Sequence, residues 1–213
     1  MIRSVMFDFG GVITSSPFEA FARYEREAGL PAGFIRLVNS TDPHGNAWAR
    51  LERGEVDVAT FAAAFEGEAR NLGHQVDGRE VLGLLRGDVR PAMVEAVKRC
   101  TEQFETACVT NNFSLDDAPT PSRVAAIYEL FDVVLESRTL GVRKPERRFY
   151  ELACEAVGVE PHEVVYLDDL GINLKPARAM GMVTIKVTDP DVALAELSAA
   201  TGLALDGTSG ASG

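Results

Sequence analysis

The chain is poor in cysteine and contains no long hydrophobic run. Its three cysteines, Cys100, Cys108 and Cys154, form neither the spacing of a metal site nor an even set for a disulfide framework. They are typical of small buried residues in a reduced, cytoplasmic protein. The apolar run that follows Arg3 ends at Asp8, which makes it too short for a signal peptide or a membrane span.

Positive charge is also scarce. The 213 residues include 21 Lys and Arg against 32 Asp and Glu, so the formal net charge is −11. This balance argues against nucleic acid and against an anionic membrane surface as partners. It is compatible with a small phosphorylated partner where a few cations gather locally. Hydrophobic residues make up 46% of a sequence without internal repeats, which indicates one globular domain with a sizeable insertion.

Two kinds of pattern divide the chain. Residues 1–14 have the pattern of a strand followed by a turn, whereas residues 15–88 have helical spacing and no convincing strand. Residues 89–206 alternate between strand and helix patterns. The composition of residues 207–213, rich in Gly and Ser, predicts a flexible tail.

The alternation after Pro91 predicts an α/β fold with a Rossmann-like parallel sheet that helices cover on both faces. The apolar runs do not alternate with polar residues, which agrees with strands buried on both sides. The expected strands are Ile2–Phe7, Phe104–Val109, Phe131–Leu135, Val164–Leu167 and Val183–Val187. The expected helices are Met93–Cys100, Val124–Leu130, Pro145–Ala156, Leu174–Met180 and Ala193–Ala200.

Polar groups follow the ends of several expected strands. They are Asp8, Thr110 with Asn111, Arg143 with Lys144, and Asp168 with Asp169. Parallel strands end at one rim of a sheet, so we expect these groups to meet there. Three carboxylates at one point repel each other unless a cation lies among them. Oxygen ligands with open coordination positions suit Mg²⁺, which shares its shell with substrate phosphate.

The remaining groups at this rim suit a phosphoryl group. Lys144 supplies a point charge for the phosphate and for the Asp8 carboxylate. Thr110 and Asn111 offer a hydroxyl, an amide and backbone N–H groups to phosphoryl oxygens. Asp8 is then the expected nucleophile, which would form an aspartyl phosphate. Positioning and charge neutralisation would supply most of the catalysis.

Four segments resemble the motifs of the haloacid dehalogenase (HAD) superfamily of hydrolases. They are Phe7–Val12, Thr110-Asn111, Lys144-Pro145 and Leu167–Asp169, and they occur in the order of the family. A longer stretch, Val165–Arg178, is similar to the phosphatase-like N-terminal domain of soluble epoxide hydrolases. The same holds for Gly181–Thr184 and Ala193–Leu203.

The resemblance implies a Mg²⁺-dependent hydrolase of small phosphate monoesters. Its core would comprise residues 1–14 and 89–206, and residues 15–88 would form a small helical cap that selects substrates. The implied metal ligands are Asp8, the backbone carbonyl of Gly10, Asp169, and Asp168 either directly or through water. Thr110, Asn111 and Lys144 would hold the phosphoryl group. Asn173 would either support the acidic pair or cap the following helix.

One position departs from the family pattern. Gly10 stands where the family has a second aspartate, which protonates the leaving oxygen and later deprotonates water. Such acid–base help is worth about 10²–10⁴-fold in rate, so esters with poor leaving groups should suffer most. His44 is a candidate substitute from the cap, and a loop-capping or solvated histidine is the alternative.

Two other functions stay open. The first is a phosphoryl-binding protein of the same fold with little turnover, which Gly10 favours. The second is a metal-independent dehalogenase, because a halide leaves without an acid; the crowding of Asp168 and Asp169 argues against it. The charges of Glu52–Glu55 are expected in solvent at a helix end, with the substrate entrance of the cap as the alternative. Arg143 is expected to point into solvent, with a contact to phosphate as the alternative. Neither the physiological substrate nor the oligomeric state is encoded in a readable pattern.

Overall fold

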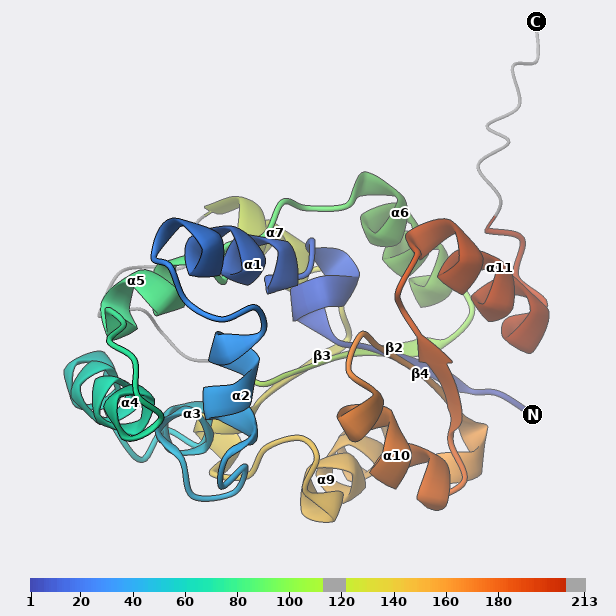
Figure 1. Ribbon diagram of the computed structural model, residues 1–213. Helices are drawn as coiled ribbons and strands as arrows, with labels where there is room; N and C mark the ends of the chain where they lie inside the picture. Colours follow the sequence, from blue (N-terminus) through green and yellow to red (C-terminus); the bar gives the residue numbers. More distant parts are fainter. Residues whose placement is uncertain (113–121, 206–213) are drawn as a thin grey trace, which may run out of the picture.

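The computed structural model describes residues 1–112 and 122–205 (Figure 1). Its parallel sheet has the strand order β3-β2-β1-β4-β5. The strands are β1 (Ser4–Phe7), β2 (Glu105–Thr110), β3 (Val133–Glu136), β4 (Val164–Asp168) and β5 (Val183–Lys186). The predicted α/β fold is therefore confirmed. The tail expected at residues 207–213 lies outside the described residues.

Helices cover both faces of the sheet. One face carries α6 (Pro91–Thr101), α7 (Ser122–Tyr128) and α11 (Pro190–Thr201), and the other carries α9 (Arg147–Val157) and α10 (Gly171–Ala179) (Figure 1). Successive residues of a strand serve opposite faces. In β1, Val5 and Phe7 belong to the first core and Met6 belongs to the second. Strands that feed two cores have no polar face, which explains their continuous apolar runs.

Several helices begin where local chemistry predicts. Pro91 occupies the first turn of α6, where a missing N–H costs nothing. The Asp189 side chain accepts hydrogen bonds from the first backbone N–H groups of α11. The α10 helix begins at Gly171, three residues earlier than its apolar spacing indicates, and only Asp169 and Leu170 separate it from the end of β4 at Asp168. A short helix, α8 (Ser137–Leu140), was not foreseen, and its single turn is too brief to show a periodicity.

A helical cap lies beyond the carboxyl ends of the strands (Figure 1). Its helices are α1 (Phe18–Glu27), α2 (Phe34–Ser40), α3 (Ala47–Glu52), α4 (Val58–Asn71) and α5 (Gly78–Gly83). The sequence did not predict α2 as a separate helix. The cap has a core of its own, in which Phe61 stacks on Phe65 at 5.5 Å and meets Trp48 edge-on at 5.2 Å.

The two segments that connect the core to the cap lie side by side. Thr14 forms an isolated antiparallel bridge with Val89, and the Ser15 N–H donates to the Asp88 carbonyl at 2.8 Å. The expected division into a core and an insertion at 15–88 stays a prediction, as does independent folding of the two parts.

Every helix within residues 1–112 and 122–205 is too short or too polar to span a bilayer.

The cap core gives a stability prediction. Replacing the fully buried Phe61 by Ala removes ring contacts and leaves a cavity, so we expect a loss of about 3–5 kcal/mol in the free energy of unfolding. Leu37, which is 51% exposed in the same cap, is the control. Its replacement by Ala should cost less than about 0.5 kcal/mol in urea unfolding. Equal losses would contradict a packed cap core.

Candidate active site

Asp8 directly follows β1, the central strand of the sheet. Its carboxylate is nearly buried, with 7% of the residue exposed. The Oδ1 atom accepts hydrogen bonds from the Phe9 backbone N–H at 2.7 Å and pairs with Lys144 Nζ at 2.8 Å. The Oδ2 atom accepts no hydrogen bond from any residue of the ranges 1–112 and 122–205. One oxygen is thus anchored, while the other has no hydrogen-bond donor in the described part of the chain.

Lys144 lies between two carboxylates. Its Nζ atom is 2.8 Å from Asp8 Oδ1 and 2.9 Å from Asp168 Oδ2, and the residue is only 1% exposed. Burial by itself lowers the pKa of a lysine, but the carboxylates of Asp168 and Asp8 raise the pKa of Lys144 above its ordinary value. The ammonium group therefore stays charged and fixes the two acids relative to each other.

Asp168 ends β4 and is fully buried. Its oxygens accept hydrogen bonds from the Tyr166 hydroxyl, the Leu170 backbone N–H at 2.8 Å and Asn173 Nδ2 at 3.1 Å. Of the two roles that the sequence left open for Asn173, the side-chain contact supports the acidic pair. The α10 helix already begins at Gly171, so Asn173 does not cap it.

Asp169 lies against the turn that follows β1. Its Oδ2 atom accepts a hydrogen bond from Ser16 Oγ at 3.1 Å. Gly11 belongs to this turn, η1 (Phe9–Ile13), and has φ +79°. A Cβ at position 11 would lie 2.2 Å from the same Oδ2 atom. Only glycine permits both the backbone conformation and the close approach.

The three acids form a cluster that fits a divalent cation. One oxygen from each of Asp8, Asp168 and Asp169 lies within 4.8 Å of the others. Burial raises the pKa of Asp8, and the neighbouring carboxylates raise it further against the opposing effect of Lys144. Burial and Asp168 also raise the pKa of Asp169 to about 6. A bound cation would relieve this repulsion, and a set of oxygen donors suits Mg²⁺.

Thr110 and Asn111 present different groups to the rim. The Thr110 hydroxyl forms no hydrogen bond with a described residue, so it is available to a phosphoryl oxygen. The Asn111 side chain is engaged: Nδ2 donates to the Lys144 carbonyl at 3.0 Å and to Glu52 Oε2 at 3.1 Å. Its Oδ1 accepts from the Lys144 N–H at 2.9 Å. The predicted phosphoryl contact of Asn111 therefore rests on its backbone N–H.

Gly10 leaves space at the position of the missing aspartate. A Cβ built there meets no atom within 4 Å, so the surroundings do not require glycine at this position. The role of the Gly10 carbonyl as a metal ligand stays a prediction. His44 is exposed, and its carbonyl accepts from Arg53 at 3.0 Å. In the described part of the chain, its ring forms no hydrogen bond or ion pair with the acidic cluster.

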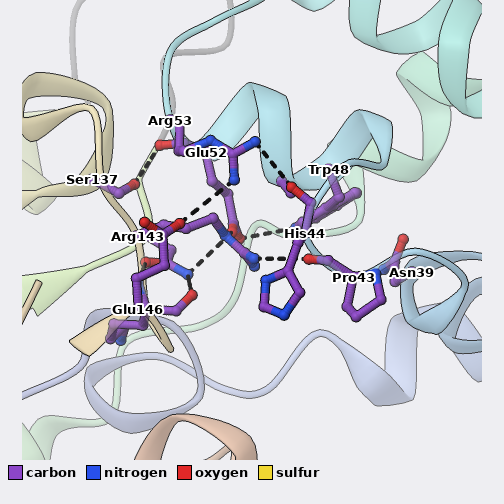
Figure 2. A network of polar contacts seen from close by, with 12 residues as sticks. Asn39, Pro43, His44, Trp48, Glu52, Arg53, Ser137, Arg143 and Glu146 are labelled. Carbon is purple, nitrogen blue, oxygen red and sulfur yellow. Dashed lines mark hydrogen bonds and ion pairs between the residues drawn. The ribbon is translucent and has the colours of Figure 1, made fainter. Parts of the chain in front are cut away.

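Glu52 is a site residue that the sequence analysis missed. The charge was expected in solvent, but Glu52 is only 7% exposed and forms an ion pair with Arg143 (Figure 2). The expectation that Arg143 points into solvent was wrong for the same reason. The available signal was the spacing of Trp48 and Glu52, because residues four apart share one helix face. Trp48 Nε1 donates to Glu52 Oε1 at 3.0 Å.

A hollow of about 350 Å³ adjoins Asp169. Three cations line it: Arg36 from the cap, Arg90 directly before α6 and Lys186 from β5. None of them forms an ion pair with a carboxylate of residues 1–112 or 122–205. The Arg36 guanidinium lies 4.9 Å from the centroid of the Phe18 ring. The hollow is thus locally positive in a chain with a net charge of −11.

The sequence model of the haloacid dehalogenase-like hydrolases matches residues 2–181. This chain belongs to that family. The resemblance seen in the four motifs is confirmed, and the chain is a HAD-like hydrolase.

Curated relatives of this HAD-like hydrolase are similar over most of its length. The bifunctional epoxide hydrolase 2 of Sus scrofa is 32% identical over 219 residues, which cover 96% of this chain but 40% of that protein. The chain therefore spans less than half of that relative. A phosphatase of Mycobacterium tuberculosis is 30% identical over 193 residues, which cover 85% of each chain.

Solved structures of HAD enzymes share the fold. One is a HAD family enzyme of Bacteroides thetaiotaomicron in complex with magnesium and inorganic phosphate. It has a TM-score of 0.60 at 18% identity and covers 89% of this chain and 96% of that chain. The L-2-haloacid dehalogenase of Xanthobacter autotrophicus reaches 0.59 at 21% identity, over 96% and 85% of the two chains. At these identities the likeness establishes the fold alone.

The raised pKa of Asp169 predicts pH-dependent metal binding. Below about pH 6 the carboxyl group becomes protonated, and a protonated carboxyl is a poor ligand. We expect the affinity for Mg²⁺ in calorimetry to fall about tenfold between pH 7.5 and pH 5. The Asp169→Asn variant should bind weakly at both pH values. Equal affinity of the native chain at the two pH values would contradict this picture.

Proposed function

We propose that this HAD-like hydrolase is a Mg²⁺-dependent phosphatase of small phosphate monoesters that works through an aspartyl phosphate on Asp8. The observation that carries the proposal is the arrangement of Asp8, which has one oxygen anchored by Lys144 and one free oxygen beside two further carboxylates. The phosphatase of Mycobacterium tuberculosis among its relatives supports the same reaction. The net charge of −11 supports a small molecule rather than nucleic acid as partner.

The side chains suggest how the reaction proceeds. Asp8, Asp168 and Asp169 would hold Mg²⁺, which supplies charge neutralisation at the phosphoryl oxygens. Asp8 Oδ2 attacks phosphorus while the ester P–O bond breaks, and the leaving oxygen takes the bonding electrons and a proton from water. A water molecule then attacks the phosphorus of the acyl phosphate. The bond to Asp8 breaks, which restores the carboxylate and releases inorganic phosphate.

Gly10 limits the substrates that suit this site. Without an acid at position 10, the leaving oxygen receives no proton from the turn. Leaving groups that are stable as anions, such as aryl, acyl or anomeric sugar oxygens, depend least on that proton. The same glycine favours the second candidate, a phosphoryl-binding protein with little turnover. The three clustered carboxylates disfavour a metal-free dehalogenase, because their repulsion would have no compensation.

Turnover of an aryl phosphate tests the proposal. We expect the native chain to hydrolyse p-nitrophenyl phosphate with Mg²⁺ and to lose this activity with a chelator or in Asp8→Asn. The Gly10→Asp variant should hydrolyse an alkyl phosphate about 10²–10⁴-fold faster than the native chain, since it regains the acid. A native chain that binds phosphate without turnover would favour the second candidate. Halide release without metal would favour the dehalogenase.

The positive hollow beside Asp169 predicts a preference among phosphate esters. A second anionic group on the substrate would meet Arg36, so Arg36→Ala should raise the KM for phosphoglycolate about tenfold, which corresponds to one lost charge-assisted hydrogen bond. The KM for phenyl phosphate, which has no second anion, should not change. Arg23, an exposed residue of the same cap, provides the control substitution to Ala. Equal effects on both substrates would exclude this contact.

A further inference from the structure

The cap places one buried carboxylate against the core. Glu52 is the last residue of α3, and its side chain accepts three N–H donors (Figure 2). Trp48 Nε1 donates to Oε1 at 3.0 Å, Asn111 Nδ2 donates to Oε2 at 3.1 Å, and the Arg143 guanidinium donates to the same Oε2. Two of these donors belong to the core and one belongs to the cap.

The backbone of the cap also approaches the core closely at this point. Ser137 Oγ donates to the Glu52 carbonyl at 2.5 Å. Two residues later, Gly54 has φ +71°, and a Cβ there would lie 2.8 Å from the Arg138 side chain. Glycine is therefore required both by the conformation and by the contact. The backbone of Glu52 is thus held against the core at this edge of the cap.

Asn111 connects Glu52 to the backbone of Lys144. The Asn111 side chain grips the Lys144 backbone at both its N–H and its carbonyl, with distances of 2.9 and 3.0 Å. Arg143, the residue before Lys144, is held by Glu52 and also donates to the Pro43 carbonyl of the cap at 3.2 Å (Figure 2). The backbone that carries Lys144 is thus fixed by contacts that converge on one cap carboxylate.

We propose that Glu52 is a positioning residue that couples docking of the cap to the placement of Lys144 against Asp8. It acts through Asn111 and Arg143, and its effect on the reaction rests on the phosphatase function proposed above. Both of its oxygens are occupied by donors, so it does not serve as the missing acid. The cap therefore shapes the phosphate end of the site as well as the entrance.

The chemistry of the contacts explains why a carboxylate is needed. Trp48, Asn111 and Arg143 all present N–H groups to position 52, and an ionised carboxylate accepts at both oxygens and donates nothing. Glutamine has the same shape but one amide group. Its N–H₂ would face one of these donors, and the Arg143 guanidinium would lose its counter-charge at a side chain that is only 13% exposed.

Steady-state kinetics of Glu52→Gln test the proposal. With p-nitrophenyl phosphate and Mg²⁺, we expect kcat to fall at least tenfold while KM changes less than threefold. The control is Glu55→Gln, because Glu55 is exposed and pairs with Arg53 without reaching Asn111. Its kcat should stay within twofold of the native value. A lower unfolding temperature with an unchanged kcat per folded molecule would show a purely structural role and overturn the proposal.

Hydrogen exchange gives a measure that does not need turnover. The Lys144 amide is protected by Asn111 Oδ1, so Glu52→Gln should speed its exchange at least tenfold, whereas Glu55→Gln should leave it unchanged. Equal exchange in native chain and Glu52→Gln would overturn the link to Lys144. Absence of turnover in the native chain would instead overturn the proposed phosphatase function, and the exchange rates would still decide the role of Glu52.

Discussion

The ion pairs of Lys144 are the interaction on which the site depends. A lysine buried among apolar strands is costly unless carboxylates compensate its charge, and Asp8 and Asp168 do so at 2.8 and 2.9 Å. The ammonium group also reduces the repulsion between the buried carboxylates of Asp8 and Asp168, which lie beside Asp169. The two acids are close because β1 and β4 are neighbouring strands. Phe7 pairs with Leu167, so Asp8 and Asp168 lie side by side at the next position.

The surplus of negative charge at this rim distinguishes the site from a structural ion-pair network. One lysine faces three carboxylates, and the pKa values of Asp8 and Asp169 are raised as a result of burial and mutual repulsion. A site with an excess of carboxylates and raised pKa values favours the binding of a cation. The cationic hollow beside it and the free oxygen of Asp8 complete a surface that suits an anionic ester. The cap contacts this centre through Glu52. We therefore expect docking of the cap to affect the reaction itself as well as the access of the substrate.

Much of this site could be predicted from residues alone. A carboxylate at the end of an apolar run, repeated after other strands, indicates a shared rim once the sheet is parallel. Asp8, Lys144, Asp168 and Asp169 do meet, and the fold class and the family are confirmed. The boundaries of elements were less accurate. Short helices such as α2 and α8 lack enough turns to reveal a period, and caps rather than hydrophobicity determine where a helix begins.

The sequence by itself determined the alternation of strands and helices and the polar groups that meet at the rim, because these follow from local periodicity and from residue chemistry. Only the tertiary structure decided which charges are buried. Glu52 and Arg143 are charged residues of the kind that usually lies on the surface. They are buried here because α3 of the cap docks on the core. The hydrogen bond from the Asn111 amide to Glu52 forms for the same reason. Burial and pairing across distant segments depend on how the two parts meet, and no local pattern carries that information.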